Sequence, residues 1–444
     1  MDSSTKTSRP RLVVLGSGWG AMSFIKSLPA NISEMYEVVV VSPRNYFLYT
    51  PLLPAVATGT MEERSIVEPV RNFIIGKEGG RGRRLLCSCS RACPLRRCCF
   101  PAAAAAATAA AAAAVATAAA AAVGSVNNTF GIRGVDQYCF YFKSIEDAGR
   151  LRARVSECFE RAALPATPEE ERKKLLTFVV VGGGPTGVEV AAELYDMIEC
   201  DLSKLYPNIV SIQIVELMDH VLSTYDRAIS IYTAEQFKRA GIKLVLNSRV
   251  AAVEDGCVRV VNKANEVTEI KFGACVWATG IAMNPLIRQL QEKLPGQSHF
   301  RSVLTDECLR VKGSDGSIWA LGDAATIDQP KVSGWVANQQ GKYLAKVFSS
   351  TKITGNPEGG GLRVRVRARA RARGGWYFHK GSAAYVGSDK AVFDLPRLGP
   401  LTGTGAGFVW KSYETMSQFS FRNQCLVAAD WLRTKIFGRD ISRV

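Results

Sequence analysis

Histidine is scarce in this chain, and its cysteines are poorly placed for a metal site. His220, His299 and His379 stand alone, so the sequence offers no histidine-centred metal or catalytic site. Five of the twelve cysteines crowd into positions 87–99, where their spacings match no zinc template, and the other seven are scattered singly. Reduced thiols and no bound metal are therefore expected.

Long hydrophobic runs are also missing. The longest candidate for a membrane span, at 102–123, is almost wholly alanine and threonine, which are too weakly apolar to insert. The first ten residues are basic and rich in hydroxyl groups, but they are too short to form a complete organelle-targeting peptide.

The positive charge is concentrated in two segments of biased composition. The formal net charge is +16, and most of it comes from residues 77–124 and from an Arg/Gly-rich run at 359–375. No basic stripe interleaved with aromatic residues accompanies this charge, so nucleic acid is not an expected partner. Both segments are low-complexity sequence, for which we predict solvated chain without a packed core.

The rest of the chain is rich in apolar residues and has room for two or three domains, given 444 residues of which 47% are hydrophobic. Its most informative stretch is residues 175–193, LLTFVVVGGGPTGVEVAAE. An apolar run predicts a buried strand, which breaks at a glycine turn and continues as a helix. Gly182 permits the turn, Gly184 lets a pyrophosphate approach the backbone, and Gly187 lets the helix pack against the strand.

An acidic residue follows at the place that a dinucleotide site requires. Glu216 closes the next predicted strand, at 209–216, where a carboxylate holds a ribose 2′-hydroxyl and repels a 2′-phosphate. The pattern therefore favours NADH over NADPH. The alternative is a glycine turn in an ordinary α/β sheet.

The N-terminal region repeats this pattern. A strand at 11–15 leads into a turn with Gly16, Gly18 and Gly20, and a helix follows. The second strand, at 37–41, ends in Ser42 rather than in an acid, which leaves FAD open as the ligand. Two such units predict two nucleotide-binding domains.

Two later strands end where ligands bind in such folds, beyond the carboxyl ends of the strands. One, at 272–277, ends in Ala278, Thr279 and Gly280, and the other, at 317–321, ends in Gly322 and Asp323. The intervening patterns predict helices at 62–75, 144–164, 226–240 and 332–350, and a solvated connector at 167–174.

The C-terminal segment, from Phe408 to Arg443, carries aromatic and aliphatic residues at helical spacing with basic residues among them. This combination is typical of a helix pair that lies in a membrane interface without crossing the membrane. The alternative is a helical hairpin packed on the protein's own surface or on a second subunit.

Long strings of this sequence resemble the type II NADH:quinone oxidoreductases, also called alternative NADH dehydrogenases, of fungal, plant and algal mitochondria. They include LGSGWGAMSFIKSL, SPRNYFLYTPLLPAVATGTMEERSIVEPVRNFI, LLTFVVVGGGPTGVEVAAEL, LGDAATID and VAADWLRTKIFGRDISRV. The resemblance extends over most of the chain, and these strings are more specific than the glycine motifs within them.

The resemblance implies an α/β fold with two Rossmann-like dinucleotide-binding domains in a glutathione-reductase-like arrangement, plus a C-terminal amphipathic helical membrane anchor. The FAD-binding domain would comprise residues 1–165 and 281–350, the NADH-binding domain residues 166–280, and the membrane-associating region residues 376–444. The implied reaction is rotenone-insensitive hydride transfer from NADH to FAD, then transfer of two electrons to a membrane quinone without proton pumping. A homodimer on the mitochondrial inner membrane, bound peripherally, is implied, with plastid or peroxisome as other locations.

The resemblance also implies three groups of site residues, and no side chain need act as a general base because the flavin supplies the chemistry. The FAD group is Gly16, Gly18, Trp19, Gly20, Ser42, Asn45, Thr50, Pro51, Gly322 and Asp323. The NADH group is Gly182, Gly184, Pro185, Thr186, Gly187, Glu189, Glu216, Thr279 and Gly280. The quinone-side group is Trp335, Val336 and Gln339.

Two departures from the family pattern generate an alternative. Residues 77–122 stand where the family has part of its FAD domain, including a parallel strand, and Trp335 stands where a glutamine is usual. The alternative is a catalytically silent NAD(H)-binding protein whose FAD domain cannot close. Flavin retained by the purified protein distinguishes the two.

Overall fold

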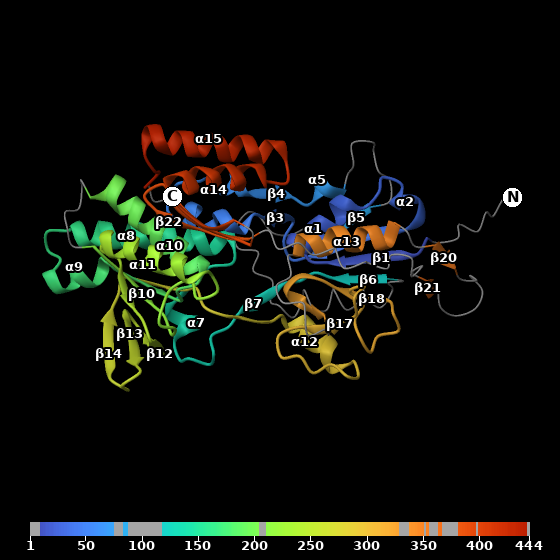
Figure 1. Ribbon diagram of the computed structural model, residues 1–444, viewed down its shortest axis with the longest axis horizontal. Coiled ribbons are helices and arrows are strands. Elements are labelled where there is room, and N and C mark those ends of the chain that lie inside the picture. Colours follow the sequence, from blue (N-terminus) through green and yellow to red (C-terminus); the bar gives the residue numbers. More distant parts are fainter. Residues whose placement is uncertain are drawn as a thin grey trace. The chain divides into compact units, whose positions relative to one another are not determined.

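The computed structural model describes residues 9–74, 83–87, 118–203, 210–327, 337–349, 352–354, 363–365, 381–396 and 398–441. The chain divides into two compact units, each built from three separate stretches (Figure 1). Unit 1 comprises Met1–Phe47, Glu68–Val126 and Ile281–His379, and unit 2 comprises Leu48–Val67, Asn127–Gly280 and Lys380–Val444.

The centre of unit 1 is a five-stranded sheet in which every neighbouring pair is parallel. Two of its inner strands, at 11–15 and 37–42, are valine-rich and buried, as expected of a parallel sheet covered on both faces. In spatial order the strands are β18 (Ile318–Ala320), β6 (Ala118–Ala121), β1 (Arg11–Leu15), β2 (Glu37–Ser42) and β5 (Arg83–Cys87).

Two of these strands come from the low-complexity segment at 77–124. β5 pairs with β2, and β6 lies between β1 and β18 with all four of its alanines buried. The prediction that this segment has no packed core is therefore wrong at its C-terminal end. Alanine has a weak strand preference, but pairing on both sides and burial between two apolar strands override it. The parallel strand that the family places here is present, while residues 88–117 lie outside the described part of the chain.

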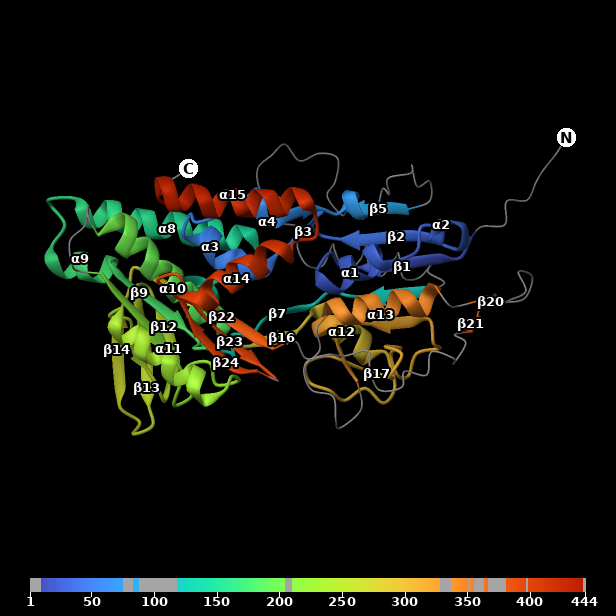
Figure 2. The ribbon, with the colours of Figure 1, turned by 45° about the horizontal axis from the view of Figure 1, so that its top comes forward.

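One face of this sheet carries α1 (Trp19–Ser27) and α13 (Ala337–Ser349), which cross at two glycines (Figure 2). A Cβ on Gly341 would lie 2.6 Å from the carbonyl oxygen of Gly20 and 2.8 Å from the backbone nitrogen of Phe24. Beyond this crossing, the Phe348 ring packs edge-on against the rings of Phe24, Tyr36 and Trp319.

Unit 2 contains a second five-stranded parallel sheet, with α10 (Pro185–Met197) following its central strand. In spatial order the strands are β11 (Lys243–Val245), β10 (Ser211–Val215), β9 (Thr177–Val181), β15 (Ala274–Trp277) and β8 (Phe140–Tyr141). An antiparallel sheet of β12 (Ser248–Glu254), β13 (Cys257–Asn262) and β14 (Val267–Lys271) packs its apolar residues against the same core.

The C-terminal part of unit 2 is a three-stranded antiparallel sheet followed by two helices, α14 (Thr404–Met416) and α15 (Phe421–Phe437). The predicted C-terminal helix pair is thus confirmed. No helix among the described residues is both long and apolar enough to cross a membrane. The three strands are β22 (Ser382–Gly387), β23 (Lys390–Leu395) and β24 (Gly399–Gly403).

The remaining elements are short or peripheral. The described helices are α2 (Ile32–Met35), η1 (Thr50–Leu52), α3 (Leu53–Ala57), α4 (Glu63–Ile66), α5 (Arg71–Ile74), α7 (Val135–Tyr138), α8 (Ile145–Ala163), α9 (Glu169–Leu175), η2 (Ile198–Leu202), α11 (Arg227–Arg239), α12 (Pro285–Glu292) and η3 (Gly322–Ala324). The described strands are β3 (Tyr46–Leu48), β4 (Val67–Pro69), β7 (Ser125–Asn127), β16 (Ile281–Met283), β17 (Val303–Thr305), β19 (Ala325–Ile327), β20 (Lys352–Thr354) and β21 (Arg363–Arg365).

Three further predictions differ from the structure. Part of the Arg/Gly-rich run at 359–375, for which we predicted solvated chain, forms β21, which pairs antiparallel with β20. The single helix predicted at 62–75 is interrupted by β4, because Pro69 disfavours the helical conformation in the residue before it. The solvated connector predicted at 167–174 contains α9. Three glutamates in its first turn and three basic residues in its last complement the helix dipole, and Lys173 pairs with Glu169 at 2.9 Å.

We expect Gly341→Ala to destabilise the protein by about 1–3 kcal/mol, because the added methyl group meets backbone atoms that cannot turn aside. Gly405→Ala is the matched control. Gly405 is also helical, but a Cβ there has nothing within 4 Å, so the change should be neutral or slightly stabilising. Urea unfolding of both variants measures the difference, and equal midpoints would contradict the close α1–α13 crossing.

Candidate functional site

In the turn after β9, Gly182 and Gly187 lie so close to neighbouring backbone atoms that neither position has room for a Cβ. Gly182 has φ +112°, and a Cβ there would lie 2.8 Å from the carbonyl oxygen of Ala278. A Cβ on Gly187 would overlap the carbonyl oxygen of Gly182. The first turn of α10 therefore packs directly on the end of the strand, as the sequence pattern predicted.

Gly184, the N-cap residue of α10, has a different environment. Its backbone is extended, with φ −72° and ψ −178°, and a Cβ there would have nothing within 4 Å. The open side of this glycine lies at the positive end of the helix dipole, where backbone N–H groups are unpaired. Such a position suits a phosphate group. Pro185 and Thr186 begin the helix here.

Glu216 follows β10 and is fixed beside the glycine turn. Its Oε2 atom accepts a hydrogen bond from the backbone nitrogen of Gly183 at 2.5 Å, and its Oε1 atom accepts one from Met218 at 2.8 Å. Two backbone donors hold the carboxylate in one orientation, so the negative charge stands next to the turn as predicted.

The end of β15 reaches the same edge of the sheet. The Thr279 hydroxyl is buried and has no hydrogen-bond partner among the described residues. Gly280 follows with φ +51°, and a Cβ there would lie 2.5 Å from the ring of Phe130. Buried hydroxyl groups are normally paired, so a bound ligand at this edge would supply the missing partner.

The corresponding turn in unit 1 has the same construction. Gly16 has φ +108°, and a Cβ there would overlap the carbonyl oxygen of Ala122. Gly18 is exposed, and a Cβ there would have nothing within 4 Å. Ser42 closes β2 and donates a hydrogen bond from its hydroxyl to that of Ser17 at 2.9 Å, inside the turn.

The strand end at Gly322 is held by α13. The Gly322 nitrogen donates to Oε1 of Gln340 at 2.5 Å, and that glutamine is buried. Asp323 is exposed and accepts a hydrogen bond from the Ser125 hydroxyl at 2.7 Å. Its carboxylate therefore keeps free acceptor positions on the solvent side. Gln339 lies on the first turn of α13, whereas Trp335 and Val336 lie outside the described residues.

The other predicted flavin residues fall in both units. Trp19 and Asn45 belong to unit 1, where the Trp19 ring packs edge-on against Phe47 at 5.0 Å. Thr50 and Pro51 belong to unit 2, where they form the short helix η1. Gly20 lies at the point where α1 crosses α13.

Glu189 is placed on the side of α10 that faces β22. Its Oε1 atom accepts a hydrogen bond from the backbone nitrogen of Tyr385 at 3.3 Å. Burial, and then the neighbouring Glu414 carboxyl, raise the pKa of Glu189 well above its usual range. Its charge environment thus differs from that of Glu216 beside the glycine turn.

A cluster of buried carboxyl groups surrounds Glu189, and the sequence patterns did not reveal it. Glu414 on α14 accepts a hydrogen bond from the Tyr49 hydroxyl at 2.7 Å, and burial raises its pKa to about 7. Asp196 accepts one from the Tyr385 hydroxyl at 2.6 Å, and burial, then Glu193, raise its pKa to about 6. Both carboxyl groups therefore resist ionisation.

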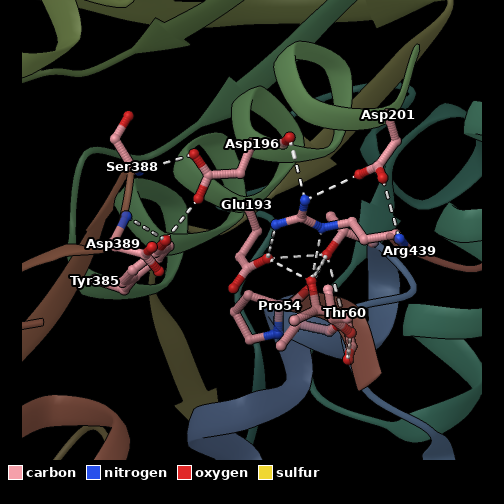
Figure 3. A network of polar contacts seen from close by, with 12 residues as sticks. Pro54, Thr60, Glu193, Asp196, Asp201, Tyr385, Ser388, Asp389 and Arg439 are labelled. Atoms are coloured by element: carbon pink, nitrogen blue, oxygen red, sulfur yellow. Dashed lines mark hydrogen bonds and ion pairs between the residues drawn. The ribbon is translucent and has the colours of Figure 1, made fainter. Parts of the chain in front are cut away.

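The only cation that reaches this cluster in the described chain is Arg439, after the end of α15 (Figure 3). It pairs with Asp201 at 3.0 Å and with Glu193 at 3.7 Å. Its Nε atom donates to the Thr60 hydroxyl, which in turn donates to Glu193 at 2.9 Å. The sequence signal was available: Glu193 and Asp196 both fall on the buried stripe of an otherwise apolar helix.

Among the described residues, no group of three or more histidine, cysteine, aspartate or glutamate residues could hold a metal ion.

The fold and the two glycine turns define the class of protein. The family model for pyridine nucleotide-disulphide oxidoreductases matches residues 10–341, and the model of the NDH2 C-terminal domain matches residues 379–440. By its architecture, the protein is thus an oxidoreductase with two dinucleotide-binding sites. Within that class, it belongs to the type II NADH dehydrogenase family, NDH2, which confirms the resemblance seen in the sequence.

Relatives and solved structures agree. The chain is 35% identical to the mitochondrial external alternative NAD(P)H-ubiquinone oxidoreductase B3 of Arabidopsis thaliana, over 99% of this chain and 91% of the relative. It is 37% identical to the mitochondrial external alternative NADH-ubiquinone oxidoreductase of Yarrowia lipolytica, over 98% and 81%. The structure of NDH2 from Plasmodium falciparum in complex with NADH matches with a TM-score of 0.83 and 26% identity, over 98% and 100%.

The raised pKa of the Glu414 carboxyl predicts how the stability of the protein depends on pH. Between about pH 4.5 and 7 the unfolded chain releases this proton while the folded protein keeps it, so this group makes the folded protein less stable as pH rises. Glu414→Gln removes the effect. The free energy of unfolding of wild type relative to the variant should fall by about 3 kcal/mol over that range.

Urea unfolding at several pH values measures the difference. Tyr49→Phe is the matched control, because it retains the carboxyl group but removes the hydrogen bond that favours ionisation. Its stability should fall with rising pH at least as steeply as that of wild type. Parallel curves for wild type and Glu414→Gln would contradict the assignment.

Proposed function

We propose that the protein is an FAD-dependent NADH:ubiquinone oxidoreductase that is rotenone-insensitive and does not pump protons. Bound FAD would supply the chemistry: a hydride acceptor for NADH and a two-electron donor for the quinone. The observation that supports this most directly is the pair of glycine turns, each with an open N-cap glycine at a helix start. A second observation is the named activity of relatives that align with almost the whole chain.

The turn in unit 1 would hold FAD. The open backbone at Gly18 leaves room for the pyrophosphate at the N-terminus of α1, and Asp323 is exposed at the end of β18, where it can accept hydrogen bonds from the ribityl chain. These features fit the group. The proposed FAD residues remain Gly16, Gly18, Trp19, Gly20, Ser42, Asn45, Thr50, Pro51, Gly322 and Asp323.

The turn in unit 2 would hold NADH. Glu216 is already fixed by two backbone donors, so its negative charge would repel a ribose 2′-phosphate without any rearrangement. This arrangement favours NADH over NADPH. The unpaired Thr279 hydroxyl would meet the nicotinamide half. The proposed NADH residues are Gly182, Gly184, Pro185, Thr186, Gly187, Glu189, Glu216, Thr279 and Gly280.

The alternative of a silent NAD(H)-binding protein depends on a FAD domain that cannot close. The sheet of unit 1 argues against it, because β5 and β6 provide its outer and inner strands with parallel pairing. For the quinone, we propose a position beside the N-terminal end of α13, near Gln339, with Trp335 and Val336 preceding it in the chain.

The C-terminal helices would bind a membrane surface, and their faces are arranged for it. The inward face of α15 carries polar residues on either side of the buried Val427. The Asn423 amide donates to the carbonyl of Val67 at 2.9 Å, and Asp430 accepts from the backbone nitrogen of Glu62 at 3.0 Å. Large apolar side chains lie on the outward face, which departs from the usual amphipathic pattern of a surface helix.

Large apolar side chains gather on the exposed side of both helices, and Lys411, Arg422 and Lys435 lie among them. Basic residues beside exposed aromatic residues suit an interface with anionic lipid headgroups. We therefore propose peripheral attachment, on the mitochondrial inner membrane by analogy with the relatives. The exposed apolar residues are Phe408, Val409, Tyr413 and Met416 on α14, and Phe421, Leu432, Ile436 and Phe437 on α15.

The reaction itself is tested with the purified full chain. We expect retained flavin absorbance and oxidation of NADH with a soluble ubiquinone analogue, with slower turnover of NADPH. Gly184→Ala should leave stability and flavin content unchanged but raise the KM for NADH about tenfold, because its methyl group occupies the phosphate side of the turn. Gly405→Ala serves as the control. Colourless protein that still binds NADH would favour the silent alternative.

Membrane attachment is tested with vesicles that contain anionic lipids. Phe421 and Phe437 are 79% and 81% exposed, so the double variant Phe421→Ser/Phe437→Ser should keep its stability and its activity with soluble quinone. Its binding to the vesicles should fall at least tenfold, because each ring contributes about 2 kcal/mol when buried.

Phe300→Ser provides the matched control, since Phe300 is 75% exposed on unit 1. Equal losses in the two variants would rule out a specific membrane face on α14 and α15. A wild-type dimer that becomes monomeric in the double variant, with vesicle binding unchanged, would instead make this face a subunit interface.

A further inference from the structure

Two cysteines that are 136 residues apart in the sequence meet at the edge of the unit 2 sheet. Cys139 directly precedes β8, and Cys275 lies within β15. The Cys139 thiol donates a hydrogen bond to Cys275 Sγ, with 3.5 Å between the sulfur atoms. No other two of the seven cysteines that the structure describes share a hydrogen bond.

The backbone geometry at this point suits a disulfide. β8 and β15 are parallel neighbours with Val276 opposite Phe140, so the same register places Cys275 opposite Cys139. Neighbouring strands lie about 4.8 Å apart, which is within the Cα–Cα range of disulfides. The sulfur atoms must approach by about 1.5 Å, which side-chain rotation provides without moving the strands.

The two thiols differ in access. Cys275 is fully buried among the apolar residues beneath the sheet, whereas Cys139 is only partly buried. The interaction with the Cys139 sulfur, followed by burial, raises the pKa of Cys275 well above its usual range. A dissolved oxidant therefore reaches the Cys139 sulfur first, and the buried Cys275 sulfur lies next to it.

We propose that Cys139 and Cys275 form a redox-active thiol pair that a peroxide converts to a reversible disulfide. The Cys139 thiolate attacks the peroxide, which yields a sulfenic acid at Cys139 and releases water or an alcohol. Cys275 then attacks the Cys139 sulfur, and the hydroxyl group leaves as water with the Cys275 proton. In all, two thiols lose two electrons and two protons, and the peroxide is reduced.

The crosslink would fix the segment that leads into β8. That segment already contacts the end of β15, since the Trp277 indole donates to the carbonyl of Asn128 at 2.9 Å. β8 has only two residues and lies at the edge of the sheet, so it depends on β15 for its pairing. A bond across the long loop between the cysteines would also restrict the unfolded chain.

The test uses the purified, flavin-loaded full chain and hydrogen peroxide. Remaining thiols are then alkylated, and the protein is digested without reduction. We expect Cys139 and Cys275 to escape alkylation and to appear together in one crosslinked peptide pair, which dithiothreitol releases. The thermal unfolding midpoint of the oxidised protein should rise by a few degrees and return after reduction.

Cys139→Ser provides the main control because this residue is only partly buried, and Cys275→Ala provides the second. Both should lose the crosslink and the thermal shift. Cys200, which is exposed, reports whether the peroxide acted. If Cys200 is oxidised while Cys139 stays free, is driven to sulfinic acid, or links to another cysteine, the proposal is overturned.

Discussion

The contact between a glycine at the end of a strand and the first turn of the following helix determines what this molecule can bind. At Gly187 a single methyl group would overlap the Gly182 carbonyl, so strand and helix approach as closely as two backbones can. That approach aims the unpaired N–H groups of α10 at one small region. Gly184 lies in that region with empty space beside it, and Glu216 is tied to the same turn. Unit 1 repeats the arrangement at Gly16 and Gly18.

The local part of this arrangement was predictable from the sequence. Strand, turn and helix are consecutive in the sequence. Each glycine of the short motif is required by a different steric constraint, so the motif predicts the turn. The same holds for the edge at Thr279 and for the helix pair at the C-terminus. Patterns within about twenty residues therefore predicted the positions of both glycine turns and of the strands that lead into them.

Other features depended on contacts that no local pattern records. The four alanines of β6 have no strand signal of their own, and only the neighbours β1 and β18 make them a strand. Tyr49 and Glu414 are 365 residues apart, and the two proposed redox cysteines are 136 apart. Contacts between side chains this far apart in the sequence are properties of the assembled fold, so composition and spacing could not reveal them.

The Arg439 contacts have a consequence for the order in which the protein acquires its structure. Arg439 neutralises carboxylates on α10 and η2 and lies 238 residues after Asp201. Unit 2 also draws strands and helices from three stretches that alternate with those of unit 1. A nascent chain that has emerged only through η2 would hold Glu193 and Asp201 without their cation, and its apolar surfaces would be uncovered. Unit 2 can therefore be completed only after Arg439 has been synthesised, and until then the chain needs protection from aggregation.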